Sequence, residues 1–298
     1  MAGTRDAVLL MTHFVDDTIV GHARRLMAEA GGRDVFVLLN KTDDVNPGYH
    51  RPADISVFEF TVEDLRSLDY PFKGRRIRDK DIELFAFTFM RAHPEYDRVW
   101  VVEYDVVYTG RWGDLFNHFD RSEAALLATS LHRWAVNPAW PNWPSVRTPD
   151  GPPVELSAYV RAFMPFYRLS RAGFQALDRA YRAGWDGFYE GIVPRILLDA
   201  GLAIEDLGGS GEFVAPHNRG RFYSSNPADN TLSPGTFVFR PIVPRPGPGA
   251  DTLWHPVKPE QATHRTGWPI KRREQIVHRA RTIARASIAR LSQLLDRQ

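Results

Sequence analysis

The sequence predicts an α/β fold in which helices flank a mostly parallel central sheet. Short apolar segments alternate with segments of helical periodicity along much of the chain, an order typical of parallel sheets. Residues 99–102 are also apolar without interruption, as in a strand that is buried on both faces. Because ligands of such sheets bind beyond the carboxyl ends of the strands, polar residues at these ends are the first candidates for a site.

Each expected element follows from apolar periodicity and from the glycine and proline residues that interrupt it. The expected strands cover residues 7–12, 34–39, 55–60, 96–107, 126–130 and 163–169. The expected helices cover residues 16–30, 81–93, 170–183 and 190–200. Residues 134–153 and 208–249 are rich in proline and asparagine, which predicts loops, the first of them over the ligand cleft.

Composition limits the chemistry. Hydrophobic residues make up 43% and charged residues 25% of the 298 residues, which is typical of a folded, soluble chain and favours one large domain over two small ones. Cysteine is absent, so any metal must be held by oxygen and imidazole ligands. A net charge of +2 gives no indication of nucleic-acid binding. The start lacks the features of a secretion signal, so we expect a cytoplasmic location.

Two carboxylates close the apolar segment at 99–102. Glu103 and Asp105 are two positions apart, and residues at this spacing in a strand face the same side of the sheet. Carboxylate oxygens are the ligands that Mg²⁺ and Mn²⁺ prefer, often together with substrate phosphates. The pattern alone is equally compatible with strand-end carboxylates that form salt bridges or cap a turn.

At this point the chain resembles the GT-A class of glycosyltransferases, whose Asp-any-Asp motif closes a strand of a Rossmann-like sheet. Glu103-Tyr104-Asp105 reads as an acidic variant of that motif, and the resemblance covers most of residues 7–258. It implies a bacterial surface-polysaccharide type of enzyme in which Asp105 binds the metal directly. Glu103 would contact the metal or the donor ribose; its role is less defined because Glu replaces the usual first Asp.

The resemblance also implies a domain organisation. A single GT-A domain would occupy residues 1–270, with a nucleotide-donor half at 1–110 and an acceptor half at 111–270. Residues 271–298 are basic and have apolar residues at helical spacing, which predicts a C-terminal amphipathic helix. This helix would lie on an anionic membrane surface, or pack on the domain or on a second subunit.

Further site residues follow from the same resemblance. His255 would be the third metal ligand, and Lys258 would meet the diphosphate as a point charge. A carboxylate near the start of the helix at 190–200 would deprotonate the acceptor hydroxyl, with Glu190 as first choice and Asp186 as second. Either acidic residue is also explained by its favourable interaction with the helix dipole.

The remaining candidates lie at strand ends and in loops. Donor contacts are expected from residues at the ends of the first two strands, namely Thr12, His13, Asn40 and Lys41. Phosphate or acceptor contacts are expected from a basic loop that contains Arg75, Arg76, Arg78 and Lys80. An aromatic acceptor wall is expected from Trp134, Trp140, Trp143 and Tyr159.

The expected function is metal-dependent transfer of a sugar from a UDP- or GDP-sugar to a hydroxyl of a glycan or lipid-linked glycan, with Mn²⁺ or Mg²⁺ as cofactor. Inversion at the anomeric carbon follows from a carboxylate base, and without that base a retaining reaction stays open. A nucleotidyltransferase is the nearest alternative, although residues 12–16 lack the glycine-rich loop that such enzymes usually carry. A non-catalytic carbohydrate-binding protein on the same fold is the other alternative.

Overall fold

A computed structural model describes residues 4–42, 52–74, 81–149 and 155–258. The chain divides into two compact units, Met1–Lys258 and Pro259–Gln298, and the second lies wholly outside the described residues. The predicted C-terminal helix therefore lies outside them as well, and so do Arg75, Arg76, Arg78 and Lys80 of the basic loop. The division into a donor half and an acceptor half stays a prediction.

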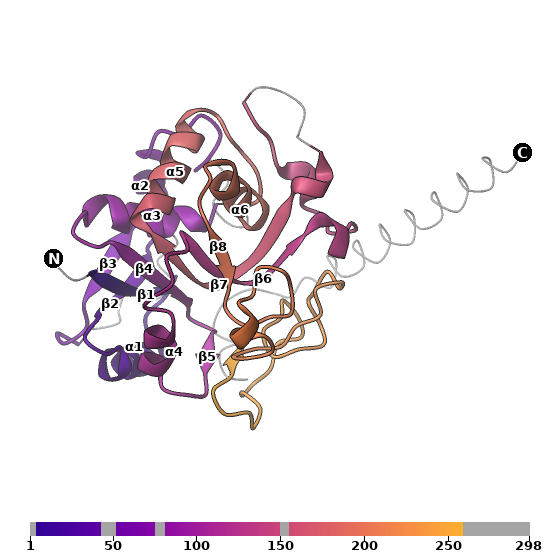
Figure 1. Cartoon of the computed structure of the whole chain (residues 1–298). Coiled ribbons are helices and arrows are strands. Elements are labelled where there is room, and N and C mark those ends of the chain that lie inside the picture. Colours follow the sequence, from indigo (N-terminus) through magenta and orange to yellow (C-terminus); the bar gives the residue numbers. More distant parts are fainter. Residues whose placement is uncertain (1–3, 43–51, 75–80, 150–154, 259–298) are drawn as a thin grey trace, which may run out of the picture. The chain divides into compact units, whose positions relative to one another are not determined.

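A seven-stranded sheet forms the centre of the first unit (Figure 1). Across the sheet the strands are β3 (Val57–Phe60), β2 (Asp34–Asn40), β1 (Asp6–Thr12), β4 (Arg98–Glu103), β7 (Val160–Ser170), β6 (Leu126–Arg133) and β8 (Ile204–Asp206). Strands β3, β2, β1 and β4 are parallel, and β6 is parallel to β8. Strand β7 is antiparallel to both of its neighbours, β4 and β6. The predicted mostly parallel sheet is confirmed.

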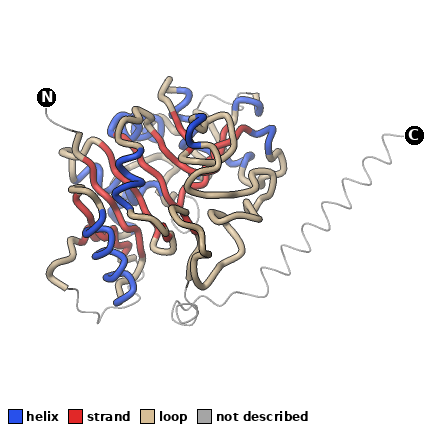
Figure 2. The backbone as a smooth tube through the Cα atoms, turned by 60° about the horizontal axis from the view of Figure 1, so that its bottom comes forward, coloured by secondary structure: helices blue, strands red, loops and turns tan. Residues whose placement is uncertain are grey.

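Helices cover both faces of this sheet (Figures 1 and 2). One face carries α1 (Asp17–Glu29) and α4 (Trp112–His118), and the other carries α2 (Val62–Arg66), α3 (Glu83–Ala92), α5 (Arg171–Arg182) and α6 (Tyr189–Asp199). Strand β1 serves both cores, because its side chains alternate between them. Leu9 faces the core beneath α3, α5 and α6, whereas Val8 and Leu10 face the core beneath α1 and α4.

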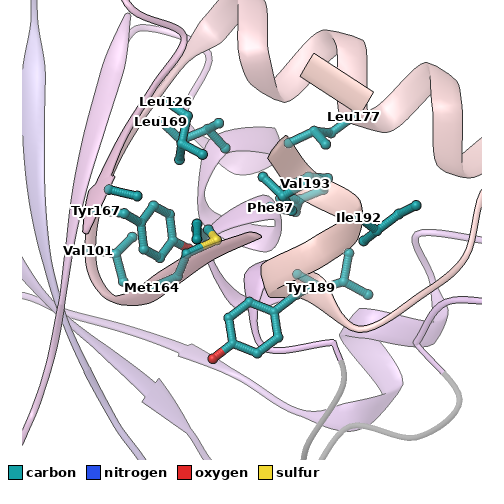
Figure 3. Close-up of a cluster of buried hydrophobic side chains, with 14 of the residues drawn as sticks. Phe87, Val101, Leu126, Met164, Tyr167, Leu169, Leu177, Tyr189, Ile192 and Val193 are labelled. Atoms are coloured by element: carbon teal, nitrogen blue, oxygen red, sulfur yellow. The ribbon is translucent and has the colours of Figure 1, made fainter. Parts of the chain in front are cut away.

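The core on the α5 and α6 side fixes the position of α6. Side chains from α3, β4, β6, β7, α5 and α6 interdigitate there (Figure 3), and those labelled are Phe87, Val101, Leu126, Met164, Tyr167, Leu169, Leu177, Tyr189, Ile192 and Val193. Each of these side chains is buried, and interiors packed in this way resist displacement. Tyr189 opens α6, so the first turn of this helix is held firmly against the sheet.

Several short elements were not expected from the sequence. These are α2, α4, β8 and a second sheet in which β5 (Val107–Tyr108) pairs antiparallel with β9 (Leu253–Trp254). Strands of two or three residues are too short to carry a detectable period, so they are decided by tertiary contacts. Among the described residues, no helix has the length and apolar character needed to cross a bilayer.

Candidate active site

The carboxyl end of β4 carries the acidic pair. Strand β4 ends at Glu103, and the next residues form a turn in which the Val106 N–H donates to the Glu103 carbonyl at 2.9 Å. Asp105 therefore lies in the turn and not in the strand. The two carboxylates converge, as expected. They do so because of this turn, so the expectation that both lie on one face of a strand was wrong.

The second sheet brings His255 to this turn. Strand β5 begins two residues after Asp105, and Val107 pairs with Trp254 of β9. Beyond that pair, the Val257 N–H donates to the Asp105 carbonyl at 2.8 Å. Residues far apart in the sequence are thereby held side by side by main-chain hydrogen bonds, which fix positions more firmly than side-chain contacts alone.

Glu103, Asp105 and His255 form a candidate cation site, the acidic cluster. One ligand atom from each residue lies within 4.8 Å of the others. His255 Nε2 is 3.6 Å from Asp105 Oδ1 and 3.8 Å from Glu103 Oε2. His255 Nδ1 lies 2.8 Å from the Val238 carbonyl, which only accepts, so this nitrogen carries the proton in the neutral ring and the Nε2 lone pair faces the carboxylates.

The acidic cluster has more negative than positive charge around it. Lys258 Nζ lies 3.2 Å from Asp105 Oδ2 and donates to the Tyr104 hydroxyl at 2.8 Å, so one ammonium faces two carboxylates. In the described part of the chain, the buried Asp105 Oδ1 has no hydrogen-bond partner. Burial, together with the charge of Asp105, raises the pKa of Glu103 well above its usual range. Two oxygen ligands and one imidazole suit a divalent cation such as Mn²⁺, which would supply the missing charge.

The acidic cluster lies where the sheet topology places ligands. The chain runs outward from β1 to β2 and β3 on one side, and β4 leads toward β7 and β6 on the other, so β1 and β4 flank the switch point of the strand order. Thr12 ends β1, is buried, and donates through Oγ1 to the Phe14 carbonyl at 2.8 Å. The His13 ring lies 5.5 Å from the Tyr104 ring, so His13 borders the acidic cluster.

The candidates at the end of β2 lie one strand further out. Asn40 Oδ1 accepts hydrogen bonds from the Thr42 N–H at 3.0 Å and from its hydroxyl at 2.6 Å. Lys41 Nζ lies 3.3 Å from a Glu59 carboxylate oxygen. Both side chains have partners within the β2 and β3 region, and the structure does not join them to the acidic cluster. Their predicted role in donor binding stays a prediction.

The structure separates the two candidate bases. Glu190 lies in the first turn of α6, is 6% exposed, and has its pKa raised to about 7 by burial, against the opposing charge of Arg161 and a backbone hydrogen bond from Met164. Its charge in turn raises the pKa of Glu103, so Glu190 lies within electrostatic reach of the acidic cluster. Asp186 is instead part of a main-chain bridge with Arg147 and has a partly exposed side chain.

Three of the four residues of the predicted aromatic wall are buried, and the fourth, Trp134, is partly buried and packs against the same core. Trp140, Trp143 and Tyr159 are 4%, 3% and 2% exposed, and all three belong to the core beneath α6. The Trp140 and Trp143 rings pack edge to face, with centroids 4.7 Å apart. These rings therefore hold the loop that contains them against α6, and they leave little ring surface for a sugar.

Two residues of the site region were not predicted. Tyr104 lies inside the acidic motif, and its hydroxyl accepts the hydrogen bond from Lys258. Arg161 lies in β7, is 1% exposed, and is close enough to Glu190 to affect its pKa. A charged residue within an otherwise apolar strand is the sequence signal that could have revealed Arg161, because buried charges require a reason.

Comparison with known proteins adds little to this geometry. No protein-family model and no curated protein sequence matches the chain. The structure of Rv0371c from Mycobacterium tuberculosis H37Rv aligns with a TM-score of 0.36 and 11% identity over 72% of this chain and 92% of that one. A proposed glucose-1-phosphate thymidylyltransferase from Bacillus anthracis, solved with sucrose, aligns with a TM-score of 0.36 and 11% identity over 70% and 88%. Likenesses this distant carry no argument about activity.

Proposed function

We propose that this protein is a metal-dependent glycosyltransferase that moves a sugar from a nucleotide-sugar donor to an acceptor hydroxyl. The observation that carries the proposal is the convergence of Glu103, Asp105 and His255 at the switch point of the sheet. A cation held there would lie where α/β sheets bind nucleotides. The combination suits a donor whose leaving group is a nucleoside diphosphate, since that group develops negative charge as it departs.

Each residue of the site has a proposed role. Asp105 and His255 hold Mn²⁺ or Mg²⁺ directly, with Glu103 as third ligand or as a contact to the donor ribose. When bound, the cation stabilises the charge of the departing diphosphate. Lys258, which already faces Asp105, adds a positive charge on the same side. His13 borders the acidic cluster next to Tyr104 and is placed to contact the donor nucleoside.

Glu190 is the proposed base for the acceptor hydroxyl. A general base works best when its pKa lies near the pH at which the enzyme operates, and burial raises the pKa of Glu190 to about 7. A direct displacement assisted by this carboxylate inverts the anomeric centre. Asp186 is partly exposed and held in a main-chain bridge, which favours Glu190 over it.

The acceptor and the location are part of the same proposal. We place the protein in the cytoplasm, with a hydroxyl of a glycan or lipid-linked glycan as acceptor. A C-terminal helix that binds anionic lipid would bring the protein to the inner face of the membrane, and a helix that pairs with a second copy would make a homodimer. Flotation of the full chain with anionic and with neutral vesicles separates these two roles.

Calorimetric titration with UDP and with GDP tests the donor class. We expect one nucleotide to bind with Mn²⁺ present, binding to be lost after chelation, and the same loss in Asp105→Ala. Asp114→Asn is the matched control, because Asp114 is an exposed carboxylate in α4 that is not part of the acidic cluster. Metal-independent binding, or unchanged binding by Asp105→Ala, would contradict the proposed site.

A second assay distinguishes glycosyl transfer from nucleotidyl transfer. A nucleotidyltransferase would release pyrophosphate from a nucleoside triphosphate in the presence of a sugar 1-phosphate, whereas a glycosyltransferase would hydrolyse or transfer from the sugar nucleotide and release the nucleoside diphosphate. Pyrophosphate release that depends on Asp105 would replace the proposed reaction while keeping the cation site. Metal-dependent nucleotide binding with neither product would support a non-catalytic binding protein.

A further inference from the structure

Strand β7 carries two buried arginines that differ in how their charge is accommodated. Arg168 is 0% exposed, and its guanidinium donates to the carbonyls of Phe119, Ser122 and Ala124 at 2.8, 2.7 and 3.1 Å. Arg161 is 1% exposed, yet in the described part of the chain its Nε and Nη1 have no hydrogen-bond partner. Among the described residues Arg168 Nε also lacks a hydrogen-bond partner, but both of its Nη atoms donate to carbonyls. Arg161 leaves two of its three guanidinium nitrogens unpaired, which is costly in a buried site and calls for another reason.

The position of Arg161 connects it to the first turn of α6. Its guanidinium carbon lies 4.7 Å from the centre of the Trp140 ring. The same ring packs against α6 at Gly191, where a Cβ atom would lie only 3.3 Å from it. Gly191 follows Glu190 directly. Trp140 therefore holds the guanidinium on one side and the helix turn that carries the candidate base on the other.

The charges around Arg161 make Glu190 its principal electrostatic partner. His132 is the cross-strand neighbour of Arg161 on β6, and it is neutral because burial and the charge of Arg161 lower its pKa to about 3. Asp229 also acts on Arg161, but less than Glu190 does. The other titratable groups that Glu190 affects are Glu103 on β4 and Tyr189 beside it on α6.

We propose that Arg161 is a positioning residue that keeps the buried Glu190 carboxylate in its charged, proton-accepting form; this rests on the proposed role of Glu190 as base. Opposite charges attract strongly where water is excluded, so a guanidinium can oppose the neutralisation that burial favours. Because Arg161 Nε and Nη1 make no hydrogen bond there, Arg161 acts on Glu190 through its charge. Neither of these two donors therefore occupies a Glu190 oxygen.

Carboxyl NMR of the full chain labelled with ¹³C-glutamate tests the proposal without any turnover. The Glu190 resonance is identified by its loss in Glu190→Gln, and its titration is followed in the wild type, in Arg161→Met and in Arg161→Lys. We expect the midpoint, near pH 7 in the wild type, to rise by about one unit or more in Arg161→Met, which is the size of an effect from a nearby charge. Arg161→Lys keeps the charge and should stay near the wild type.

Arg168→Lys is the matched control, because Arg168 is an equally buried arginine on the same strand whose two Nη atoms donate to main-chain carbonyls. It should leave the Glu190 midpoint unchanged even if it lowers the melting temperature. An unchanged midpoint in Arg161→Met would overturn the proposal. If Arg161→Met does not fold, the Arg161→Lys variant decides. A Glu190 midpoint equal to that of the wild type supports the role of the charge. A midpoint that rises although the lysine keeps the charge overturns the proposal.

The dependence of kcat on pH distinguishes a failure of this proposal from a failure of the proposed function. If Glu190 is the base, the acidic limb of kcat should move up in pH together with the NMR midpoint in Arg161→Met. If the Glu190 midpoint moves but that limb does not, Glu190 is not the base. The effect of Arg161 on the Glu190 pKa would still stand.

Discussion

Two buried aspartates at strand ends of the same sheet have opposite surroundings. Asp206 ends β8 and accepts hydrogen bonds from the N–H groups of Leu131, Gly208 and Gly209 at 2.8, 3.0 and 2.9 Å, and from the Tyr223 hydroxyl at 2.7 Å. Asp105 follows β4; its Oδ2 lies 3.2 Å from Lys258 Nζ, and its Oδ1 has no hydrogen-bond partner within the described ranges. The two residues are buried to a similar degree, 1% and 4% exposed.

The difference separates a structural carboxylate from one that is available to a ligand. The protein satisfies the charge of Asp206 with its own donors, so that this residue joins β6, β8 and the segment that contains Tyr223. Asp105 instead faces a second carboxylate, an imidazole lone pair and a single ammonium, that of Lys258. One ammonium beside two carboxylates leaves a negative charge that a divalent cation would compensate. Burial alone therefore does not distinguish the two aspartates; the hydrogen-bond donors that reach each carboxylate do.

The largest expected effect is on the stability of the protein when Asp206 is replaced. Asp206→Ala leaves three buried N–H groups and one hydroxyl without an acceptor, so we expect the free energy of unfolding to fall by about 3–5 kcal/mol. Urea unfolding followed by circular dichroism measures it, with Asp114→Asn as the surface control. A loss below about 1 kcal/mol would show that the donors find other partners and that the two aspartates differ less than their contacts indicate.

The opposite behaviour is expected at Asp105. Mn²⁺ at one hundred times its dissociation constant should stabilise the wild type by about 2.7 kcal/mol, because it binds the folded state alone. Asp105→Ala should lose this stabilisation, since a ligand that is held by three side chains loses one of them. Thermal unfolding with Mn²⁺ and with chelator measures the difference. Equal stabilisation of Asp105→Ala and wild type would place the cation elsewhere.

Glu190 is a third buried carboxylate, whose pKa burial raises although the charge of Arg161 and a backbone hydrogen bond from Met164 oppose the rise. Its folded-state pKa, about 7, lies above the usual value of 4.5, so the unfolded chain releases this proton at lower pH and stability falls as pH rises from 5 to 7. The loss at this site comes to about 2 kcal/mol. Glu190→Gln should remove that part of the pH dependence, as measured by urea unfolding at pH 5, 6 and 7. Parallel curves for the two proteins would contradict the raised pKa.

The smallest effect is expected at Glu103. In the absence of divalent cation at pH 8, Glu103→Gln removes a carboxylate charge next to Asp105 and should raise the free energy of unfolding by about 1 kcal/mol, the repulsion of two unit charges 4 Å apart in water. The same variant should bind Mn²⁺ more weakly than the wild type. A variant that is less stable without cation would mean that Glu103 is satisfied by contacts other than the acidic cluster.

Sequence reasoning found the parts of the site that a short segment encodes. Glu103 and Asp105 stand together at the end of an apolar run, so the pair was evident, although the turn that joins them was not. His255 came from the resemblance to a family and not from its surroundings in the sequence. Arg161 was missed because its proposed role depends on Trp140 and Glu190, which come from a separate loop and a helix.

The sequence by itself determined the long elements and their order, because apolar periodicity over seven to thirteen residues records which faces are buried. It also limited any metal site to oxygen and imidazole ligands through the absence of cysteine. Only the tertiary structure decided which strand ends meet. His255 reaches Asp105 through β5 and β9, strands of two residues whose pairing leaves no periodic trace and depends on main-chain hydrogen bonds between distant segments.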